Sequence, residues 1–223
     1  RGLGDVYKRQ KIYSNPANDA FTDDNFYKCV VDAYNEKNNT SLPYTTNLSD
    51  EQLETITLLY CDMSNKSDEE KIKNVDGLEK LTALIWLNVS YNQLTELDVS
   101  KNTALTNLDA NNNQLTKLDV SKNTALSWLE AHNNQLTELD VSKNTALTHL
   151  SAYYNQLTEL DVSKNTALRT LYADNNQLTK LDVSKNTALT ELSAYSNQLT
   201  NLDVSKNTCL LYTSPSPRDR SLS

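Results

Sequence analysis

Two histidines and three cysteines are the side chains of this chain best suited to bind a metal ion or act as nucleophiles. Neither His132 nor His149 is accompanied by the pair of cysteines or carboxylates that would complete a zinc site in the sequence. Cys29 and Cys61 could form a disulfide or remain as buried free thiols. We therefore predict no bound metal ion and no cofactor.

The motifs of common enzyme classes are missing from the sequence. It contains no GxSxG, HExxH or P-loop motif, and catalysis needs a nucleophile, base or metal held in a pocket. An aspartate recurs every 21 residues from Asp98 to Asp203, but the surrounding DVSKN segment lacks the glycine and final glutamate of an EF-hand loop. Because a lysine follows three residues later, we expect a solvated ladder of charges, and we predict that the protein is not an enzyme.

Aromatic and polar side chains at equivalent positions of successive segments are the candidates for binding a ligand. Tryptophan and tyrosine offer large rigid surfaces and often dominate interface energies. The strongest candidates form a stripe of Trp86, Trp128, His149, Tyr153, Tyr172 and Tyr195. The full predicted ligand-binding set is Trp86, Asn88, Tyr91, Asn107, Asp109, Trp128, Glu130, His132, His149, Tyr153, Tyr154, Tyr172, Asp174 and Tyr195.

The element that positions these side chains is a repeat of 21 residues. One unit has leucines at 105, 108, 115 and 118 and an asparagine at 113, which is the LxxLxLxxNxL pattern of leucine-rich repeats. Six units follow one another from Leu84 to Thr208, the last one incomplete. Leu108 and Ala110 alternate with polar residues, as in a strand with one buried face. Stacked units therefore predict a parallel concave sheet with strands about 4.8 Å apart.

Asparagines recur in both halves of the unit. Asn113 follows the concave strand, where its amide can donate to and accept from backbone groups that the turn leaves unpaired. A second asparagine column runs from Asn102 to Asn207, and residues 118–120 match the strand of the first half. We therefore predict an α/β repeat solenoid, a right-handed leucine-rich-repeat superhelix with a parallel concave β-sheet, short convex strands and an N-terminal helical cap.

The residues before the repeats are suited to cover the open end of the solenoid, as repeat proteins require. Residues 23–36 place apolar side chains on one helical face, with Asp23 or Asp24 as the N-cap, and residues 49–52 begin a second helical turn. The predicted divisions are a helical cap at 11–55, a degenerate first repeat and lead-in at 56–83, and the regular repeats at 84–208.

The two ends of the chain are related to each other. Residues 1–10 and 209–219 can be translated from opposite strands of one DNA sequence, as in a sequencing-library adapter. We therefore predict that residues 1–10 and 209–223 are adapter-derived, disordered and off the solenoid, and that residues 11–208 are a fragment. The apolar side chains around Leu199 should then be exposed at an open edge.

Composition limits the classes of partner. The formal net charge is −8, and five of the seven charged residues in the two end segments are basic, so the remainder is more acidic still. Such a chain lacks the basic surface of a nucleic-acid-binding protein, and no apolar run is long enough to span a bilayer. We predict a protein or glycan ligand on the concave face, with no nucleic acid and no membrane insertion.

The chain resembles the amino-terminal region of bacterial internalins over about residues 20–208. The resemblance rests on the helical cap, the segment GLEKLTAL at 77–84 and the repeats with LDVSxN. It implies a secreted or cell-surface adhesion protein. Members of that branch often carry a cysteine ladder, which the resemblance places at positions where this chain has Ala110, Ala131, Ala152, Ala173 and Ala194.

Variation among the six repeats bears on function. The LTxLDVSKNTA half hardly changes, which favours a structural spacer or a targeting domain of a larger surface protein or secreted enzyme. The concave positions vary, which favours a binding surface, although aromatic residues are also common on exposed strands. We predict an extracellular ligand-binding or adhesion module.

Overall fold

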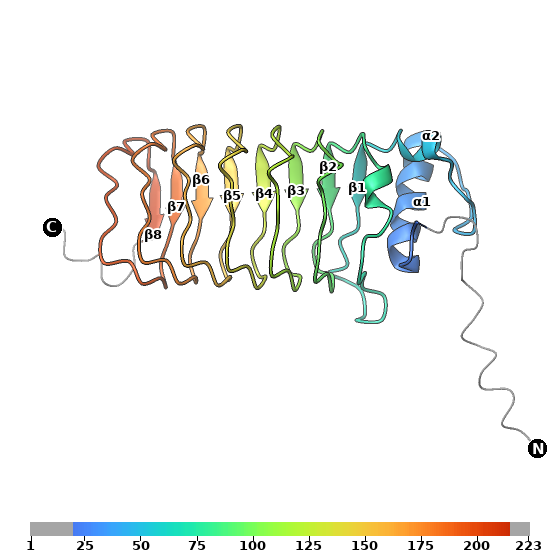
Figure 1. The fold of residues 1–223 in the computed structure, drawn as a ribbon, viewed down its shortest axis with the longest axis horizontal. Helices are drawn as coiled ribbons and strands as arrows, with labels where there is room; N and C mark the ends of the chain where they lie inside the picture. Colours follow the sequence, from blue (N-terminus) through green and yellow to red (C-terminus); the bar gives the residue numbers. More distant parts are fainter. Residues whose placement is uncertain (1–19, 215–223) are drawn as a thin grey trace, which may run out of the picture.

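The computed structural model describes residues 20–214, which form an elongated solenoid with two helices at its amino-terminal end (Figure 1). Eight three-residue strands stack in chain order into one parallel sheet. The strands are β1 (Leu58–Tyr60), β2 (Trp86–Asn88), β3 (Asn107–Asp109), β4 (Trp128–Glu130), β5 (His149–Ser151), β6 (Thr170–Tyr172), β7 (Glu191–Ser193) and β8 (Tyr212–Ser214). The predicted leucine-rich-repeat solenoid with a parallel sheet is therefore confirmed.

The length of the repeat sets the register of the sheet. Equivalent residues of consecutive repeats pair directly, so Leu87, Leu108 and Leu129 lie in one column. All three are fully buried, and each buried leucine contributes roughly 1.5–3 kcal/mol to stability. Such columns give the solenoid one continuous apolar core, and each turn of the chain, here called a rung, packs on the next.

Asn113 and its equivalents hold the turn after each concave strand. The Nδ2 of Asn113 donates to the carbonyl of Val89 in the preceding rung at 2.9 Å and to two carbonyls of its own turn. Its Oδ1 accepts from the backbone N–H of Leu94 at 3.0 Å. The predicted role of this amide as both donor and acceptor is confirmed.

The convex side lacks the short strands that the sequence predicted. Residues 118–120 and their equivalents in the described chain form no strand. The Nδ2 of Asn123 donates instead to the carbonyls of Val99 and Asn102 in the preceding rung, at 3.0 and 2.9 Å. Side-chain amides thus link the convex turns of neighbouring rungs. The Oδ1 of Asn123 is buried without a hydrogen-bond partner, as in all six convex asparagines.

The helix α1 (Asp24–Asn38) lies against the first rung. Asp23 is its N-cap: Oδ1 accepts from two backbone N–H groups of the first turn, and Oδ2 accepts from the N–H of Lys73 at 2.8 Å. The short helix α2 (Asp50–Leu53) begins with a capping box, and the 3-10 helix η1 (Leu78–Lys80) leads into the repeats. The carboxylate of Asp23 therefore caps the start of α1 and links this helix to the lead-in segment around Lys73.

The two cysteines of the cap are free thiols. Cys29 on α1 and Cys61 after β1 are both buried. Burial raises the pKa of the Cys61 thiol well above its usual value, and its hydrogen bond with Cys29 adds to the effect. Of the two alternatives that the sequence left open, the structure has the pair of buried thiols.

Residues 209–214 continue the solenoid, so the prediction that 209–223 lies off it is wrong for this segment. Leu210 packs against the core, and β8 pairs with β7 in the register of the repeats. Cys209 and Leu210 follow the Thr-Ala-Leu frame of earlier units, and strand pairing uses backbone groups that any sequence provides. Leu199 is consequently buried, not exposed. The predicted adapter segment 1–10 and residues 215–223 lie outside the described residues.

Candidate functional site

The concave face of the sheet presents the fourteen predicted binding residues in columns. The middle residue of each strand faces the core, and the residues on either side face outward. The register places Trp86, Asn107 and Trp128 in the first column, while Asn88 and Asp109 belong to the second. Side chains from rungs far apart in the sequence therefore become neighbours along the solenoid.

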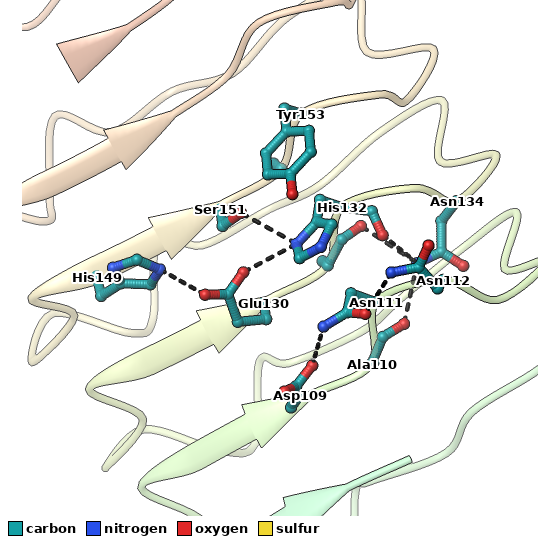
Figure 2. A network of polar contacts seen from close by, with 12 residues as sticks. Asp109, Ala110, Asn111, Asn112, Glu130, His132, Asn134, His149, Ser151 and Tyr153 are labelled. Atoms are coloured by element: carbon teal, nitrogen blue, oxygen red, sulfur yellow. Dashed lines mark hydrogen bonds and ion pairs between the residues drawn. The ribbon is translucent and has the colours of Figure 1, made fainter. Parts of the chain in front are cut away.

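Glu130 lies between the two histidines of the chain (Figure 2). Its Oε2 is 2.9 Å from His132 Nδ1, and its Oε1 is 2.8 Å from His149 Nε2. The Oγ of Ser151 is 3.2 Å from the same His132 nitrogen. Burial alone would raise the pKa of Glu130, but hydrogen bonds from the two histidines and Ser151 outweigh it and lower the pKa to about 2. Glu130 is therefore a carboxylate fixed in position and ionised at neutral pH.

Aromatic rings on neighbouring strands stack along the solenoid. The rings of Trp128 and His149 are 3.7 Å apart and inclined by 5°, and those of His132 and Tyr153 are 4.2 Å apart and inclined by 11°. Tyr172 meets His149 edge to face at 5.9 Å. Strands about 4.8 Å apart leave little space between large side chains, so adjacent rings close over one another.

This stacking corrects two of the predicted contact residues. His149 is only 7% exposed beneath its neighbours, and Asp174 is also buried. Trp128, in contrast, is 41% exposed. Trp128 is therefore the accessible member of the stacked pair, and His149 packs beside it against one face of the indole.

Within the described residues, Asp109 on β3 forms no hydrogen bond or ion pair with a histidine. Its Oδ1 accepts a hydrogen bond from Asn111 Nδ2 (Figure 2). Burial, followed by the nearby charge of Glu130, raises the pKa of Asp109 to about 6. The pKa values of two carboxylates on adjacent strands are thus shifted in opposite directions. Both histidines form hydrogen bonds with Glu130, whereas Asp109 feels only the more distant charge of His132.

Two exposed tyrosines occupy backbone positions that tyrosine disfavours. Tyr91 and Tyr154 have φ angles of 56° and 51°, in the left-handed region. The same position of other rungs holds Asn112, Asn133 and Asn175, and asparagine adopts this conformation more readily. Both tyrosines project from the edge of the concave face, where their side chains are 42% and 53% exposed.

The remaining predicted residues line the same face, half-buried. The hydroxyl of Tyr172 donates to Glu191, and this bond raises the pKa of Tyr172 to about 12. Asn88, Asn107 and Tyr195 are likewise half-buried.

Sequence reasoning missed the amino-terminal end of this surface. Leu58 and Tyr60 on β1 are largely exposed, and the Tyr60 ring meets Trp86 at 5.3 Å in an edge-to-face contact. The signal was present in the outward positions on either side of Leu59, but the predicted binding surface left out the degenerate first repeat.

Within residues 20–214, no group of three or more histidine, cysteine, aspartate or glutamate residues is arranged to hold a metal ion. The helices of this same region are too short or too polar to cross a membrane.

The sequence and the fold were compared with those of known proteins. No family model matches it. Internalin J of Listeria monocytogenes is 44% identical over 85 residues, which are 38% of this chain and 8% of Internalin J. The solved functional domain of InlJ from the same organism, which includes a cysteine ladder, is 36% identical with a TM-score of 0.57. That match covers 90% of this chain and 52% of the solved one.

Two further solved structures share the fold. The leucine-rich-repeat protein LIC12759 of Leptospira interrogans is 27% identical with a TM-score of 0.65, over 74% of this chain and 45% of its own. Internalin C2 of Listeria monocytogenes is 21% identical with a TM-score of 0.66, over 89% and 96% of the two chains. This chain thus spans about half of the solved InlJ domain and a small part of Internalin J. It has the leucine-rich-repeat fold, and its sequence is similar to that of Internalin J.

Proposed function

We propose that this solenoid is the ligand-binding module of an extracellular adhesion protein and that it recognises a protein or a glycan through its concave face. The observation that carries the proposal is the placement of Tyr91 and Tyr154. Both sit exposed in left-handed backbone positions, where asparagine would cost less. Backbone strain of this kind persists mainly at functional sites.

The composition of the concave face supports the same proposal. Tyrosine, tryptophan, asparagine and serine dominate its columns, and these residue types also dominate the binding surfaces of antibodies. The stacked pairs Trp128–His149 and Tyr153–His132 hold aromatic groups rigidly before a ligand arrives, which reduces the entropy lost on binding. The extracellular location is inferred from the similarity to internalins.

The test is binding of the purified protein to an array of glycans and an array of extracellular proteins. We expect the double variant Tyr91→Asn/Tyr154→Asn to lose the signals of the wild type while keeping its fold, because asparagine suits both backbone positions. The matched control is Lys122→Gln/Glu138→Gln, which changes exposed positions of the convex half. Equal binding by the wild type and the tyrosine variant would contradict the proposal.

A structural spacer is the alternative function. The near identity of the convex half from repeat to repeat favours it, because a spacer needs only uniform stacking. A targeting domain of a larger surface protein or secreted enzyme would have the same repeats. For a spacer, neither the concave nor the convex variant changes any binding signal.

A further inference from the structure

The strand β3 separates the two strands that begin with tryptophan. The register aligns Trp86 on β2, Asn107 on β3 and Trp128 on β4. The backbones of the two tryptophans therefore stand two strand spacings apart, about 10 Å, with the shorter side chain of Asn107 between them. Asp109 lies two residues farther along β3, in the neighbouring column between Asn88 and Glu130. Trp86 is 39% exposed and Trp128 is 41% exposed. We call this space, formed by Trp86, Asn107, Asp109 and Trp128, the tryptophan slot.

Both walls of the tryptophan slot have their aromatic contacts on the outer side. His149 on β5 stacks in parallel on Trp128, so the opposite face of that indole is turned toward β3. The contact of Trp86 is with Tyr60 on β1, away from β3. Within residues 20–214, no aromatic ring contacts the sides of the two indoles that face β3.

The negative charge of Asp109 lies at one side of the tryptophan slot, in the neighbouring column, and is only partly compensated. Asp109 accepts from the neutral amide of Asn111, and within the described residues it forms no ion pair with lysine, arginine or histidine. The strands β1–β4 contain no lysine or arginine. The nearby carboxylate of Glu130 repels the ionised form of Asp109 and adds to the rise in its pKa. A positive charge placed here would relieve this repulsion.

We propose that the tryptophan slot binds the guanidinium or ammonium group of an arginine or lysine side chain on a protein partner. A cation above Asn107, midway between the walls, would lie about 5 Å from each, within the roughly 6 Å over which indole rings attract cations. The carboxylate of Asp109 would supply the counter-charge. A neutral sugar could use the same walls, but it would leave the repulsion between the two carboxylates in place. This inference rests on the proposed function, because it takes the concave face as the binding surface.

The probe is a capped tetra-arginine peptide, with the capped tetra-citrulline peptide as its neutral counterpart of nearly the same shape. Binding is followed by the indole N–H signals of Trp86 and Trp128 in NMR spectra. We expect the arginine peptide to bind at least about tenfold more tightly, and Asp109→Asn to reduce its affinity by about tenfold. The matched control Glu138→Gln removes the same charge from the convex side and should leave the affinity unchanged.

Three outcomes would overturn the proposal. These are equal affinity for the two peptides, equal effects of Asp109→Asn and Glu138→Gln, or arginine-independent binding of chitotetraose that shifts the two indole signals. The same measurements distinguish a failure of this inference from a failure of the proposed function. If the array signals depend on Tyr91 and Tyr154 but not on Asp109, and the arginine peptide does not bind, the concave face is a binding surface and the tryptophan slot is not a cation site.

Discussion

At the scale of single residues, Asp109 and Glu130 show how neighbours decide the properties of the same chemical group. Both are partly buried carboxylates on adjacent strands. The pKa of Glu130 is lowered to about 2, because hydrogen bonds from two histidines and Ser151 outweigh its burial. The pKa of Asp109 is raised to about 6 by its burial and by Glu130 itself. Glu130 is held by hydrogen bonds within the fold, whereas Asp109 is the carboxylate that we propose meets the cation of a partner.

The variant Asp109→Asn should be more stable than the wild type at pH 7.4. Because the pKa of Asp109 is higher in the folded protein than in the unfolded chain, its contribution to stability is complete below about pH 4 and is lost as the pH rises through about 6. We expect the free energy of unfolding of the variant to be higher by on the order of 1–2 kcal/mol at pH 7.4, after allowance for the partial exposure of this group.

Urea unfolding at pH 4 and pH 7.4 measures this effect. The advantage of the variant should shrink at pH 4, where the wild-type carboxyl is protonated in the folded state. A variant less stable than the wild type at pH 7.4 would contradict the assignment of Asp109 as a repelled carboxylate.

Tyr91 is a second residue at which a change that weakens the proposed binding should stabilise the fold. Its left-handed backbone and its exposed ring predict that Tyr91→Asn raises the free energy of unfolding by roughly 0.5–1 kcal/mol. The reverse change at the same position of the next rung, Asn112→Tyr, should lower it by a similar amount. Chemical denaturation of both variants is the measurement, and a loss of stability in Tyr91→Asn would show that the ring supports the fold.

At the scale of elements, the two asparagine columns form different sets of hydrogen bonds in the two turns of each rung. The amide of Asn113 uses both its donor and its acceptor, whereas Asn123 uses only its donor and buries an unpaired oxygen. An unpaired buried oxygen is unfavourable in itself. The concave turn therefore depends more on its asparagine than the convex turn does.

This difference predicts the order of two alanine variants. Asn113→Ala removes one hydrogen bond from each of three carbonyl groups, which keep other donors, and leaves the N–H of Leu94 without a partner, so it should cost about 1–3 kcal/mol. Asn123→Ala removes one hydrogen bond from each of two carbonyl groups, and it also removes the unpaired oxygen. It should therefore cost less. Both residues lie in the interior of the array, which makes equilibrium unfolding a fair comparison. Equal or reversed costs would show that the unpaired oxygen has no energetic consequence.

At the scale of the whole molecule, each rung packs only on its neighbours, so whole repeats can be removed in frame. Deletion of residues 105–125 removes β3 and places Trp86 beside Trp128. Deletion of residues 168–188 removes β6 and leaves the tryptophan slot intact. We expect both proteins to fold and unfold cooperatively, which thermal melting followed by circular dichroism would show.

The two deletions should differ in binding. Only the protein without residues 105–125 should lose its preference for the arginine peptide over the citrulline peptide, because it lacks both Asp109 and the space between the indoles. Unchanged preference in that protein would place the cation site elsewhere on the surface.

The repeat period by itself determined most of the architecture. A leucine pattern with a period of 21 residues puts equivalent side chains in register, and this implies the parallel sheet and the columns of Leu87, Leu108 and Leu129. The role of Asn113 also follows from sequence, as does an N-cap at Asp23 or Asp24, of which the structure has Asp23. These features depend on periodicity or on contacts within a few residues of the chain, so one sequence is enough to predict them.

Other features were decided only by the tertiary structure. Whether His149 is exposed depends on how the ring of Trp128 in the preceding rung lies over it. Convex strands are absent from the described residues, although residues 118–120 match the frame of the concave strand, and residues 212–214 join the sheet because an exposed edge accepts backbone groups of any sequence. The shifted carboxylates and the tryptophan slot arise between rungs, where the rotamers and charges of adjacent strands, rather than the repeat pattern, set the distances.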